Sequence, residues 1–385
     1  MKVSLVCEQL LQSVPGGIGV YLSGLIKGLS QVNISGLDLS LMSSGPMDSH
    51  QDINSRFDQT VIAQNRLVSK SIHLLWTHST LRFPGRFAVG SDVVHAPSFV
   101  YPRLAGTSLT VVVHDLTWKK YPEAFTRHGV RWHDKALKRS IELASGFIVP
   151  SSQTQEDLHL ELERHKRNIP IRLIEWGADH VAPGAVAPGA VAPRAVAPGD
   201  SEANRGNLKE YGITKPYFIT LGTLEPRKNL SRIIEAFCLA NRRIGYGLQL
   251  LVVGPKGWGN IKVASPSIDE SVIFAGKVSD FARDNLLRQS FGCLYVPLQE
   301  GWGFPVVEAM KCGVPVISSD VPSASGGSFK VDPTSIEEIS QAIVDFYSDV
   351  SLREKYIGLG NSRVSELTWE KCARRHVSVW EEFRG

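Results

Sequence analysis

The hydrophobic residues of this chain are concentrated in short runs that do not alternate with polar residues. Ten such runs recur: KVSLV, DVVHA, LTVVVHD, GFIVPS and IRLIEW, then YFITLG, LQLLVVG, SVIFAG, CLYVP and GVPVISS. Uninterrupted Val, Ile and Leu runs that end at Gly, Ser, His or Asp are typical of parallel strands covered by helices on both faces. Because helical segments separate the runs, the pattern predicts an α/β chain with two groups of strands.

One low-complexity segment separates the two groups of runs. Residues 181–199 repeat AVAPG with a five-residue period and one variant at Arg194. Proline at every fifth residue, with Gly and Ala, does not build a packed element, so we expect an extended linker or surface loop between two domains. A recognition motif is the alternative, but the segment has no PxxP spacing and almost no charge.

Composition indicates an ordinary globular protein. The chain has 385 residues, of which 43% are hydrophobic and 21% are charged. It is long enough and apolar enough to form two or three domains, each with its own core. No apolar stretch predicts a secretory leader or a membrane span, so we expect a cytosolic protein. The five cysteines are widely spaced without a CxxC pair, which argues against a zinc site and a disulfide framework and favours small buried side chains.

Charge is mild overall but locally uneven. A net charge of +4, without basic repeats interleaved with aromatics, gives no indication of a nucleic-acid partner. One stretch of helical spacing, however, sets five cations against the single acid Asp134; the cations are Arg127, Arg131, Lys135, Lys138 and Arg139. This helix has two interpretations: a solvated face, or a surface that contacts an anionic membrane.

The strongest chemical signal is PLQEGWGFPVVEAMKCGVPV, residues 297–316, in which seven residues separate Glu300 from Glu308. The glycines beside Trp302 allow the backbone to approach a ligand, and Pro305 suits the first turn of a helix. Loop amides and a helix N-terminus attract a phosphate, whereas carboxylates accept hydrogen bonds from hydroxyls. We therefore expect a ligand that carries both phosphate and hydroxyl groups. A solvated first-turn acid is the alternative for Glu308.

A second signal is YFITLGTLEPRKNLSRIIEAF, in which a strand and a Gly222-Thr223 turn precede two cations. Arg227 and Lys228 stand just before a helix that is expected to start near Asn229. Cations at a helix N-terminus are unfavourable for the helix dipole. Their position is reasonable if they face a diphosphate, with Arg as a fork and Lys as a point charge.

Two features mark the N-terminal half. PGGIGVYLSGLIKGLS, residues 15–30, is a glycine-rich turn that opens an amphipathic helix, but it lacks the third glycine of a dinucleotide fingerprint and favours close approach of a substrate to the backbone. In VVVHDLTW, His114 stands at the end of a strand, where open α/β sheets bind ligands. It is positioned to donate to a sugar hydroxyl, or else to bond with local backbone, and Asp115 is a candidate helix cap.

Taken together, GGIGVY, VVHDLTW, IVPSSQTQEDL, GTLEPRKNL, LLVVGPKGWG, VIFAGKVSD and EGWGFPVVEAMKCGVPVISSD resemble glycosyltransferase family 4 over nearly the whole chain. Members of that family have the GT-B fold and retain anomeric configuration. The HDL and GTLEPRKN segments are most similar to bacterial mannosyltransferases of O-antigen or capsule assembly.

The resemblance implies roles for individual residues. Arg227 and Lys228 would bind the donor diphosphate, Glu300 the transferred sugar and Glu308 the ribose. His114 would meet the donor sugar from the opposite domain. The catalytic residues would be His114, Arg227, Lys228 and Glu300. The residues that would line the donor pocket are Gly17, Gly222, Thr223, Lys277, Val278, Gly301, Trp302, Gly303, Phe304 and Pro305.

The resemblance also implies an architecture and a reaction. We expect two Rossmann-like domains facing each other across a cleft: an acceptor domain over residues 1–180, a linker over 181–204, a nucleotide-sugar domain over 205–364, and a terminal helix over 365–385 that crosses back to the first domain. The expected reaction moves a sugar from a nucleoside-diphosphate donor, with GDP-mannose as the best guess, to a hydroxyl of a glycan or lipid-linked acceptor. No metal or other cofactor is expected, in keeping with the lack of an Asp-x-Asp element.

Some features depart from the family pattern or leave other functions open. The segment VPSASGGSFKVDP after Asp320 is shorter than usual, and the repeat expands a normally brief connection. A non-catalytic nucleotide-sugar-binding protein and a GT-B epimerase or phosphorylase remain alternatives. A Rossmann oxidoreductase is disfavoured because no GxGxxG follows the first strand.

Overall fold

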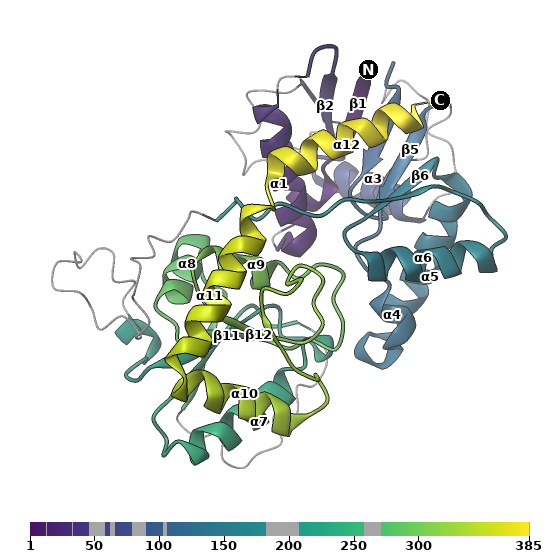
Figure 1. Cartoon of the computed structure of the whole chain (residues 1–385). Helices are drawn as coiled ribbons and strands as arrows, with labels where there is room; N and C mark the ends of the chain where they lie inside the picture. The colour runs from purple at the N-terminus through teal and green to yellow at the C-terminus, as the bar shows by residue number, and fades with distance from the viewer. Residues whose placement is uncertain are drawn as a thin grey trace. The chain divides into compact units, whose positions relative to one another are not determined.

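The computed structural model describes residues 1–12, 14–32, 34–45, 58–61, 66–78, 90–102, 106–181, 208–257 and 271–384 (Figure 1). The chain divides into two compact units. The first comprises Met1–Leu116, Arg127–Gly177 and Leu367–Gly385, and the second comprises Thr117–Thr126 and Ala178–Glu366. The expected α/β class with two domains is confirmed. Nearly all of the AVAPG repeat, residues 182–199, lies outside the described residues.

A seven-stranded parallel sheet forms the centre of the first unit, in the order β3-β2-β1-β4-β5-β6-β7. The strands are β1 (Lys2–Val6), β2 (Asp38–Ser43), β3 (Asp58–Val61), β4 (Val93–Ala96), β5 (Ser108–Val112), β6 (Gly146–Val149) and β7 (Ile171–Leu173). The helices of this unit are η1 (Glu8–Leu11), α1 (Gly16–Gln31), α3 (Arg66–His78), α5 (Arg127–Leu143), α6 (Ser152–Arg164) and α12 (Trp369–Phe383). The strand order reverses at β1, the kind of switch point at which open sheets bind ligands beyond the strands' carboxyl ends.

The second unit contains a six-stranded parallel sheet in the order β10-β9-β8-β11-β12-β13. Its strands are β8 (Tyr217–Leu221), β9 (Gln249–Val253), β10 (Val272–Gly276), β11 (Gly292–Tyr295), β12 (Val316–Ser318) and β13 (Phe329–Lys330). Its helical segments are α4 (Thr117–Lys120), η3 (Pro122–Ala124), η5 (Leu208–Tyr211), η6 (Pro226–Lys228), α7 (Leu230–Arg243), α8 (Asp280–Arg288), α9 (Phe304–Lys311), α10 (Ile336–Ser348) and α11 (Val350–Ser365). The order reverses at β8, so the loops after β8 and β11 flank a switch point.

The core of the second unit explains why its strands are uninterrupted apolar runs. The strands β8, β9, β11 and β12 are fully buried, and α7 and α10 pack against one another over the sheet (Figure 1). β10 differs because it is an edge strand: alternate side chains, among them Phe274, are exposed. The expectation of strands buried on both faces therefore fails at this edge.

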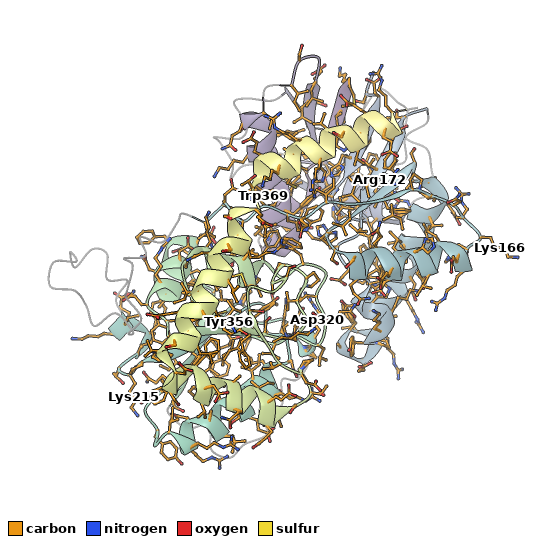
Figure 2. All side chains as sticks on the ribbon, viewed as in Figure 1. Lys166, Arg172, Lys215, Asp320, Tyr356 and Trp369 are labelled. Atoms are coloured by element: carbon orange, nitrogen blue, oxygen red, sulfur yellow. The ribbon has the colours of Figure 1, made fainter. Side chains whose placement is uncertain are left out.

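The terminal helix α12 packs on α1 within the first unit, as expected from the resemblance. The contact depends on the lack of side chains around Trp369, which begins α12 (Figure 2). A Cβ at Gly24 would lie 2.0 Å from the Trp369 ring, and one at Gly28 would lie 2.2 Å from the Trp369 carbonyl oxygen. A Cβ at Gly177 would lie 2.5 Å from the Trp369 backbone nitrogen. These three glycines thus permit α12 to dock.

A fully buried chain of hydrogen bonds also holds α12. The Trp380 indole Nε1–H donates to His95 Nδ1 at 3.1 Å, because an indole can only donate. His95 then carries its proton on Nε2, which donates to the Tyr21 hydroxyl at 2.9 Å. The Tyr21 hydroxyl donates to His376 Nε2 at 2.8 Å, and His376 Nδ1–H donates to the carbonyl of Cys372 at 2.8 Å. Every donor in this chain has an acceptor while both histidines are neutral.

The other sequence expectations concern cysteines and membranes. The five cysteines form no disulfide, and four are buried while Cys238 is half-buried, which largely agrees with their prediction as small buried side chains. Within the described part of the chain, no helix combines the length and the apolar character needed to cross a membrane.

Candidate active site

The site forms where the loops after β8 and β11 meet in the second unit. The loop after β9 also packs closely on the β8 loop and requires glycine there, because a Cβ at Gly254 would lie 1.9 Å from the carbonyl oxygen of Gly222. Gly222 itself has φ +141, and the Lys228 side chain lies against it. The Lys228 side chain therefore lies at the carboxyl end of β8.

Asn229 fixes the conformation of the β8 loop. It has a left-handed backbone, with φ 60, between η6 and α7. Its side-chain Nδ2 donates to the carbonyls of Val296 at 3.1 Å and Pro333 at 2.7 Å. The backbone N–H of Leu298 donates to the Arg227 carbonyl at 2.9 Å, which ties the β8 loop to the chain after β11. The loop that carries the two cations is thus held rigidly.

The two predicted cations both bond to one predicted carboxylate. Arg227 Nη1 lies 2.8 Å from Glu300 Oε1, and Lys228 Nζ donates to the same oxygen. Lys228 Nζ also donates to the Tyr295 hydroxyl at 2.7 Å, and Arg227 Nε lies 2.5 Å from Glu225 Oε1. The cations and Glu300 were expected to contact different parts of a ligand; in the structure they also contact each other.

The electrostatics of this cluster are balanced. Burial would raise the pKa of Glu300, but the charges of Arg227 and Lys228 outweigh it and lower the pKa to about 2. Burial and the neighbouring Arg227 charge lower the pKa of Lys228. Two cations and two carboxylates, Glu225 and Glu300, thus form a neutral group in a largely desolvated place. A bound anion would have to change these pairings.

The predicted glycine-rich loop lies between Glu300 and α9. Gly303 has φ +95 and precedes the first residue of α9, and a Cβ there would lie 2.3 Å from Val321 Cγ1. The Ser323 hydroxyl donates to the Gly303 carbonyl at 2.9 Å, and its backbone N–H donates to the Trp302 carbonyl at 3.1 Å. The shortened segment after Asp320 therefore packs directly on this loop. Gly301, Trp302 and Phe304 are buried, and Pro305 lies in the first turn of α9, as predicted.

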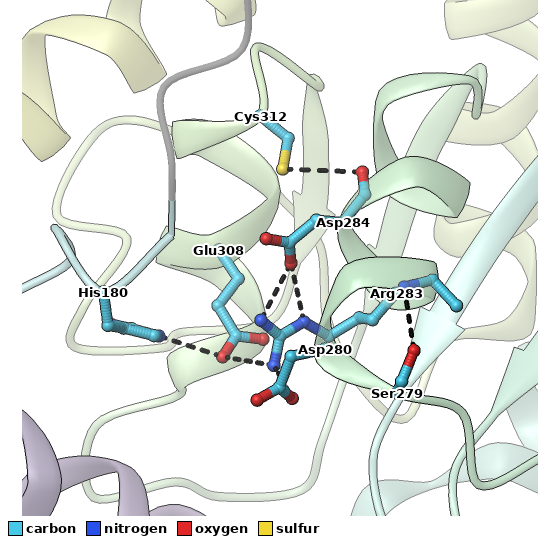
Figure 3. Close-up of polar contacts among 8 residues, drawn as sticks. His180, Ser279, Asp280, Arg283, Asp284, Glu308 and Cys312 are labelled. Atoms are coloured by element: carbon cyan, nitrogen blue, oxygen red, sulfur yellow. Dashed lines mark hydrogen bonds and ion pairs between the residues drawn. The ribbon is translucent and has the colours of Figure 1, made fainter. Parts of the chain in front are cut away.

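Glu308 has different partners from Glu300. Its side chain is only 6% exposed, and its Oε1 lies 3.2 Å from His180 Nε2 and 3.5 Å from Arg283 Nη1 (Figure 3). Burial would raise the pKa of Glu308, but the His180 hydrogen bond and the Arg283 charge lower it below its ordinary value. The alternative of a solvated first-turn acid is therefore wrong. Lys277 and Val278 directly precede Ser279, which caps the helix of Arg283.

The predicted residues of the first unit are His114 and Gly17. His114 follows β5, and its Nε2–H donates to the Pro97 carbonyl at 2.8 Å. Burial lowers the pKa of His114, so the ring is neutral and Nδ1 carries a lone pair. His114 was expected to donate to a hydroxyl or to bond with local backbone; the structure instead gives a backbone partner 17 residues away and leaves Nδ1 as an acceptor. Gly17 lies exposed in the first turn of α1.

Several residues of the site were not found from the sequence. Glu225 stands two positions before Arg227 and could have been noticed as its counter-ion. Tyr295 ends an apolar strand and gave no polar signal, while His180 and Arg283 lie 128 and 25 residues from Glu308 in the numbering. Among the residues that the structure describes, no group of three His, Cys, Asp or Glu side chains could hold a metal ion. Metal independence remains a prediction.

Part of the chain is similar to known proteins. Residues 204–361 match the family model of glycosyl transferases group 1. The O-antigen chain mannosyltransferase B of Escherichia coli is 25% identical over 298 residues, which covers 75% of this chain and 74% of that protein. The phosphatidyl-myo-inositol mannosyltransferase of Mycobacterium tuberculosis is 25% identical over 198 residues, but the match covers 48% of this chain and about half, 52%, of that protein.

Solved structures agree with the fold. The Anabaena protein HepE, in complex with UDP and glucose, superposes with a TM-score of 0.68 at 16% identity, over 99% of this chain and 100% of that chain. A sucrose-phosphate synthase from Thermosynechococcus elongatus gives 0.67 at 16% identity, over 99% and 98%. At such identity the likeness shows the fold, which is GT-B. Residues 204–361 thus form a glycosyl transferases group 1 domain, and the chain that carries it is a glycosyltransferase.

Proposed function

We propose that this glycosyltransferase moves a mannosyl unit from GDP-mannose to a hydroxyl of a glycan or lipid-linked acceptor, with retention of anomeric configuration, in the assembly of a cell-surface polysaccharide. The observation that carries the proposal is the pairing of Arg227 and Lys228 on Glu300 at the switch point of the second sheet. The names of the two relatives above support mannose, and the name of the O-antigen chain enzyme supports a surface polymer.

The cations would act on the leaving group. As the bond between the anomeric carbon and the donor phosphate oxygen breaks, negative charge grows on the diphosphate, and a new bond forms to the acceptor oxygen. The acceptor proton passes to an oxygen of the leaving diphosphate. Arg227 and Lys228 are held in place before the reaction by Glu225, Glu300 and Tyr295. Donors placed in this way are each worth roughly 3 to 4 kcal/mol.

The carboxylates would hold hydroxyls. Glu300 lies beside the cations and would accept from the transferred sugar, and Glu308 would accept from the ribose. With two cations already facing the diphosphate, this scheme requires no metal. The rest of the proposed donor pocket is formed by Gly222, Thr223, Lys277, Val278 and the loop from Gly301 to Pro305. His114 would accept a hydrogen bond from the donor sugar through Nδ1.

A donor panel tests the proposal. The purified chain is incubated with GDP-, UDP- and dTDP-sugars and oligosaccharide acceptors, with and without EDTA, beside Lys228→Ala and the matched control Lys209→Ala, whose lysine is exposed. We expect GDP release from GDP-mannose that persists in EDTA, falls by about 10²-fold in Lys228→Ala and is unchanged in Lys209→Ala. Proton NMR of the product should show the donor's anomeric configuration. Release of a different nucleotide would contradict the GDP-mannose assignment.

The same panel separates the two alternatives. A non-catalytic binding protein would retain a nucleotide sugar without releasing a nucleotide even with acceptors present. An epimerase or phosphorylase would give a free sugar epimer or a sugar phosphate instead of an extended glycan. Equal turnover by Lys228→Ala and the unchanged chain would refute the role of the cation cluster.

A contact with an anionic membrane is part of the proposal for the first unit. On α5, Arg127, Arg131, Lys135 and Lys138 are exposed at intervals that place them along one side of the helix. Arg139 is not part of this set, which corrects the five expected from the sequence. It lies 4.4 Å over the Tyr101 ring and donates to the Tyr101 carbonyl at 2.7 Å.

Four exposed cations would attract anionic lipid by about 1 kcal/mol each near the surface, and salt would screen that attraction. Flotation with vesicles of phosphatidylglycerol and phosphatidylcholine should recover the chain at low salt. Replacing Arg131 and Lys135 by Gln should weaken recovery, whereas replacing Lys209 and Lys215 by Gln should not. Recovery that is the same on pure phosphatidylcholine would leave α5 as a solvated helix face.

A further inference from the structure

The carboxylate of Glu308 is held by two residues that come from other elements. His180 lies in the segment after β7, three residues beyond Gly177, the last residue of the first unit in that part of the chain. Arg283 lies in α8, and Glu308 itself lies in α9. Figure 3 shows the side chains of His180 and Arg283 reaching the carboxylate of Glu308.

Both partners bond to the same oxygen. His180 Nε2 lies 3.2 Å and Arg283 Nη1 lies 3.5 Å from Glu308 Oε1. A carboxylate only accepts, so His180 donates through Nε2. Glu308 Oε2 accepts no hydrogen bond from the residues that the structure describes. The carboxylate is thus divided into one oxygen that is held and one oxygen that can accept from a ligand.

Arg283 binds Glu308 weakly, because its contacts with other carboxylates are shorter. Its Nε and Nη2 donate to Asp284 Oδ1 at 2.9 and 2.8 Å, and Nη1 donates to Asp280 at 3.1 Å. The contact with Glu308 is the longest of the four. His180 therefore provides the shorter and better directed bond to Oε1.

The position of His180 is itself restricted. Its side chain is 17% exposed, and its ring meets the Phe304 ring edge to face, with 5.6 Å between centroids. Phe304 is the first residue of α9, the helix of Glu308. The contact thus holds the imidazole against the same helix on which the carboxylate stands, and this fixes the direction from which the N–H points at Oε1.

We propose that His180 is a positioning residue of the donor site, which holds Oε1 of Glu308 so that Oε2 accepts a hydroxyl of the donor's ribose. The inference rests on the proposed function, because it takes Glu308 as the ribose ligand. His180 touches no part of the donor. It acts by preventing rotation of the carboxylate, and a bond to a charged group of this kind is worth about tenfold or more in binding.

Binding of nucleotides with and without ribose hydroxyls tests this role. GDP and UDP, each beside its 2′,3′-dideoxy form, are titrated calorimetrically into the unchanged chain, His180→Ala, His180→Gln and the control His159→Ala, whose ring is exposed on α6. For the nucleotide that binds, we expect His180→Ala to raise the Kd of the ribose form about tenfold and leave that of the dideoxy form unchanged. The Gln side chain places an N–H donor where imidazole Nε2 lies, so His180→Gln should restore most of the affinity.

A thermodynamic cycle with Glu308→Gln completes the test. If His180 acts through Glu308, then introducing His180→Ala into the Glu308→Gln variant should raise the Kd of the ribose nucleotide by less than a factor of two. Loss of affinity for ribose and dideoxy forms alike, or full additivity in the cycle, would overturn the inference while leaving the proposed function intact. Failure of the unchanged chain to bind any nucleoside diphosphate would overturn both.

Discussion

Acid should destabilise the first unit well before the second, because buried neutral histidines are concentrated there. Burial lowers the pKa of each of four histidines of this unit: His95, His114, His133 and His376. His376 and His95 belong to the chain of hydrogen bonds that also includes Tyr21 and Trp380. Protonating His376 at Nε2 would remove the acceptor for the Tyr21 hydroxyl, and no carboxylate among the described residues bonds to the ring.

The magnitude follows from proton linkage at His376. Its pKa falls from 6.5 to about 4 in the folded chain. Below pH 6.5 the unfolded chain therefore binds a proton at His376, whereas the folded chain binds it only below about pH 4. The contribution of the neutral ring to the free energy of unfolding is fully present above pH 6.5 and is lost as the pH falls. From about pH 8 to about pH 5 this one histidine should reduce the free energy of unfolding by about 2 kcal/mol. The other three histidines act in the same direction.

The second unit should not respond in that interval. Its shifted carboxylates, Glu300 and Glu308, have pKa values lowered from 4.5, so their contribution is present above 4.5 and is lost only at lower pH. Urea unfolding at about pH 8 and pH 5, read by hydrogen exchange of peptides from α12 and β4 and from α7 and α10, separates the two units. Protection in α12 and β4 should weaken first.

Two variants make this test specific. Tyr21→Phe with His376→Leu removes the titrating ring together with the hydroxyl that faces it, so the pH dependence should shrink by about 2 kcal/mol whatever the change in overall stability. His159→Gln alters an exposed ring and should leave the dependence unchanged. Equal midpoints at both pH values for the unchanged chain, or earlier loss of protection in α7 and α10, would refute the reasoning.

Three further predictions concern single side chains. Gly28→Ala places a methyl group 2.2 Å from the Trp369 carbonyl oxygen and should lower the free energy of unfolding by about 1–3 kcal/mol in urea titrations, whereas Gly358→Ala, with open space in α11, should raise it by about 0.5–1 kcal/mol. Tyr295→Phe removes the hydroxyl that accepts from the site's lysine at 2.7 Å and should lower kcat by less than about tenfold in donor assays, with Kd for the nucleotide little changed. Glu300→Gln should tighten binding of the nucleoside diphosphate about fivefold in calorimetry, because the cluster loses a negative charge, yet lower kcat by more than about tenfold.

The fold followed from the sequence wherever a strand is fully buried. The interior strands of the second sheet are continuous apolar runs because helices cover both faces. β2 was missed because its sequence DLSLMS alternates polar and apolar residues, although Ser40 is buried and its hydroxyl lies 2.9 Å from that of Ser4. β13 has only two residues, too few to give a periodic signal.

The site was predicted in its parts but not in its contacts. Arg227 and Lys228 could be chosen because cations at the start of a helix are unfavourable, and Glu300 because of its spacing from Glu308 across the glycine loop. Their pairing could not, because Glu300 lies 72 positions after Lys228 and only the sheet order brings β8 beside β11. His180 gave no local signal, since nothing in the sequence around it departs from an ordinary loop.

If the proposed function holds, the neutral charge of the cluster explains why Glu300 lies next to the two cations. Without a counter-ion, two buried cations would repel each other, and burial together with the Arg227 charge lowers the pKa of Lys228. Glu300 compensates by accepting from both. A donor diphosphate brings its own negative charge, so the cations can bond to phosphate oxygens and Glu300 can turn its bonding capacity to sugar hydroxyls. The same carboxylate would then serve as counter-ion in the empty site and as hydroxyl acceptor in the occupied site. A glutamine amide could accept from a sugar hydroxyl but could not act as a counter-ion. Glu300→Gln should therefore separate binding of the nucleotide from turnover.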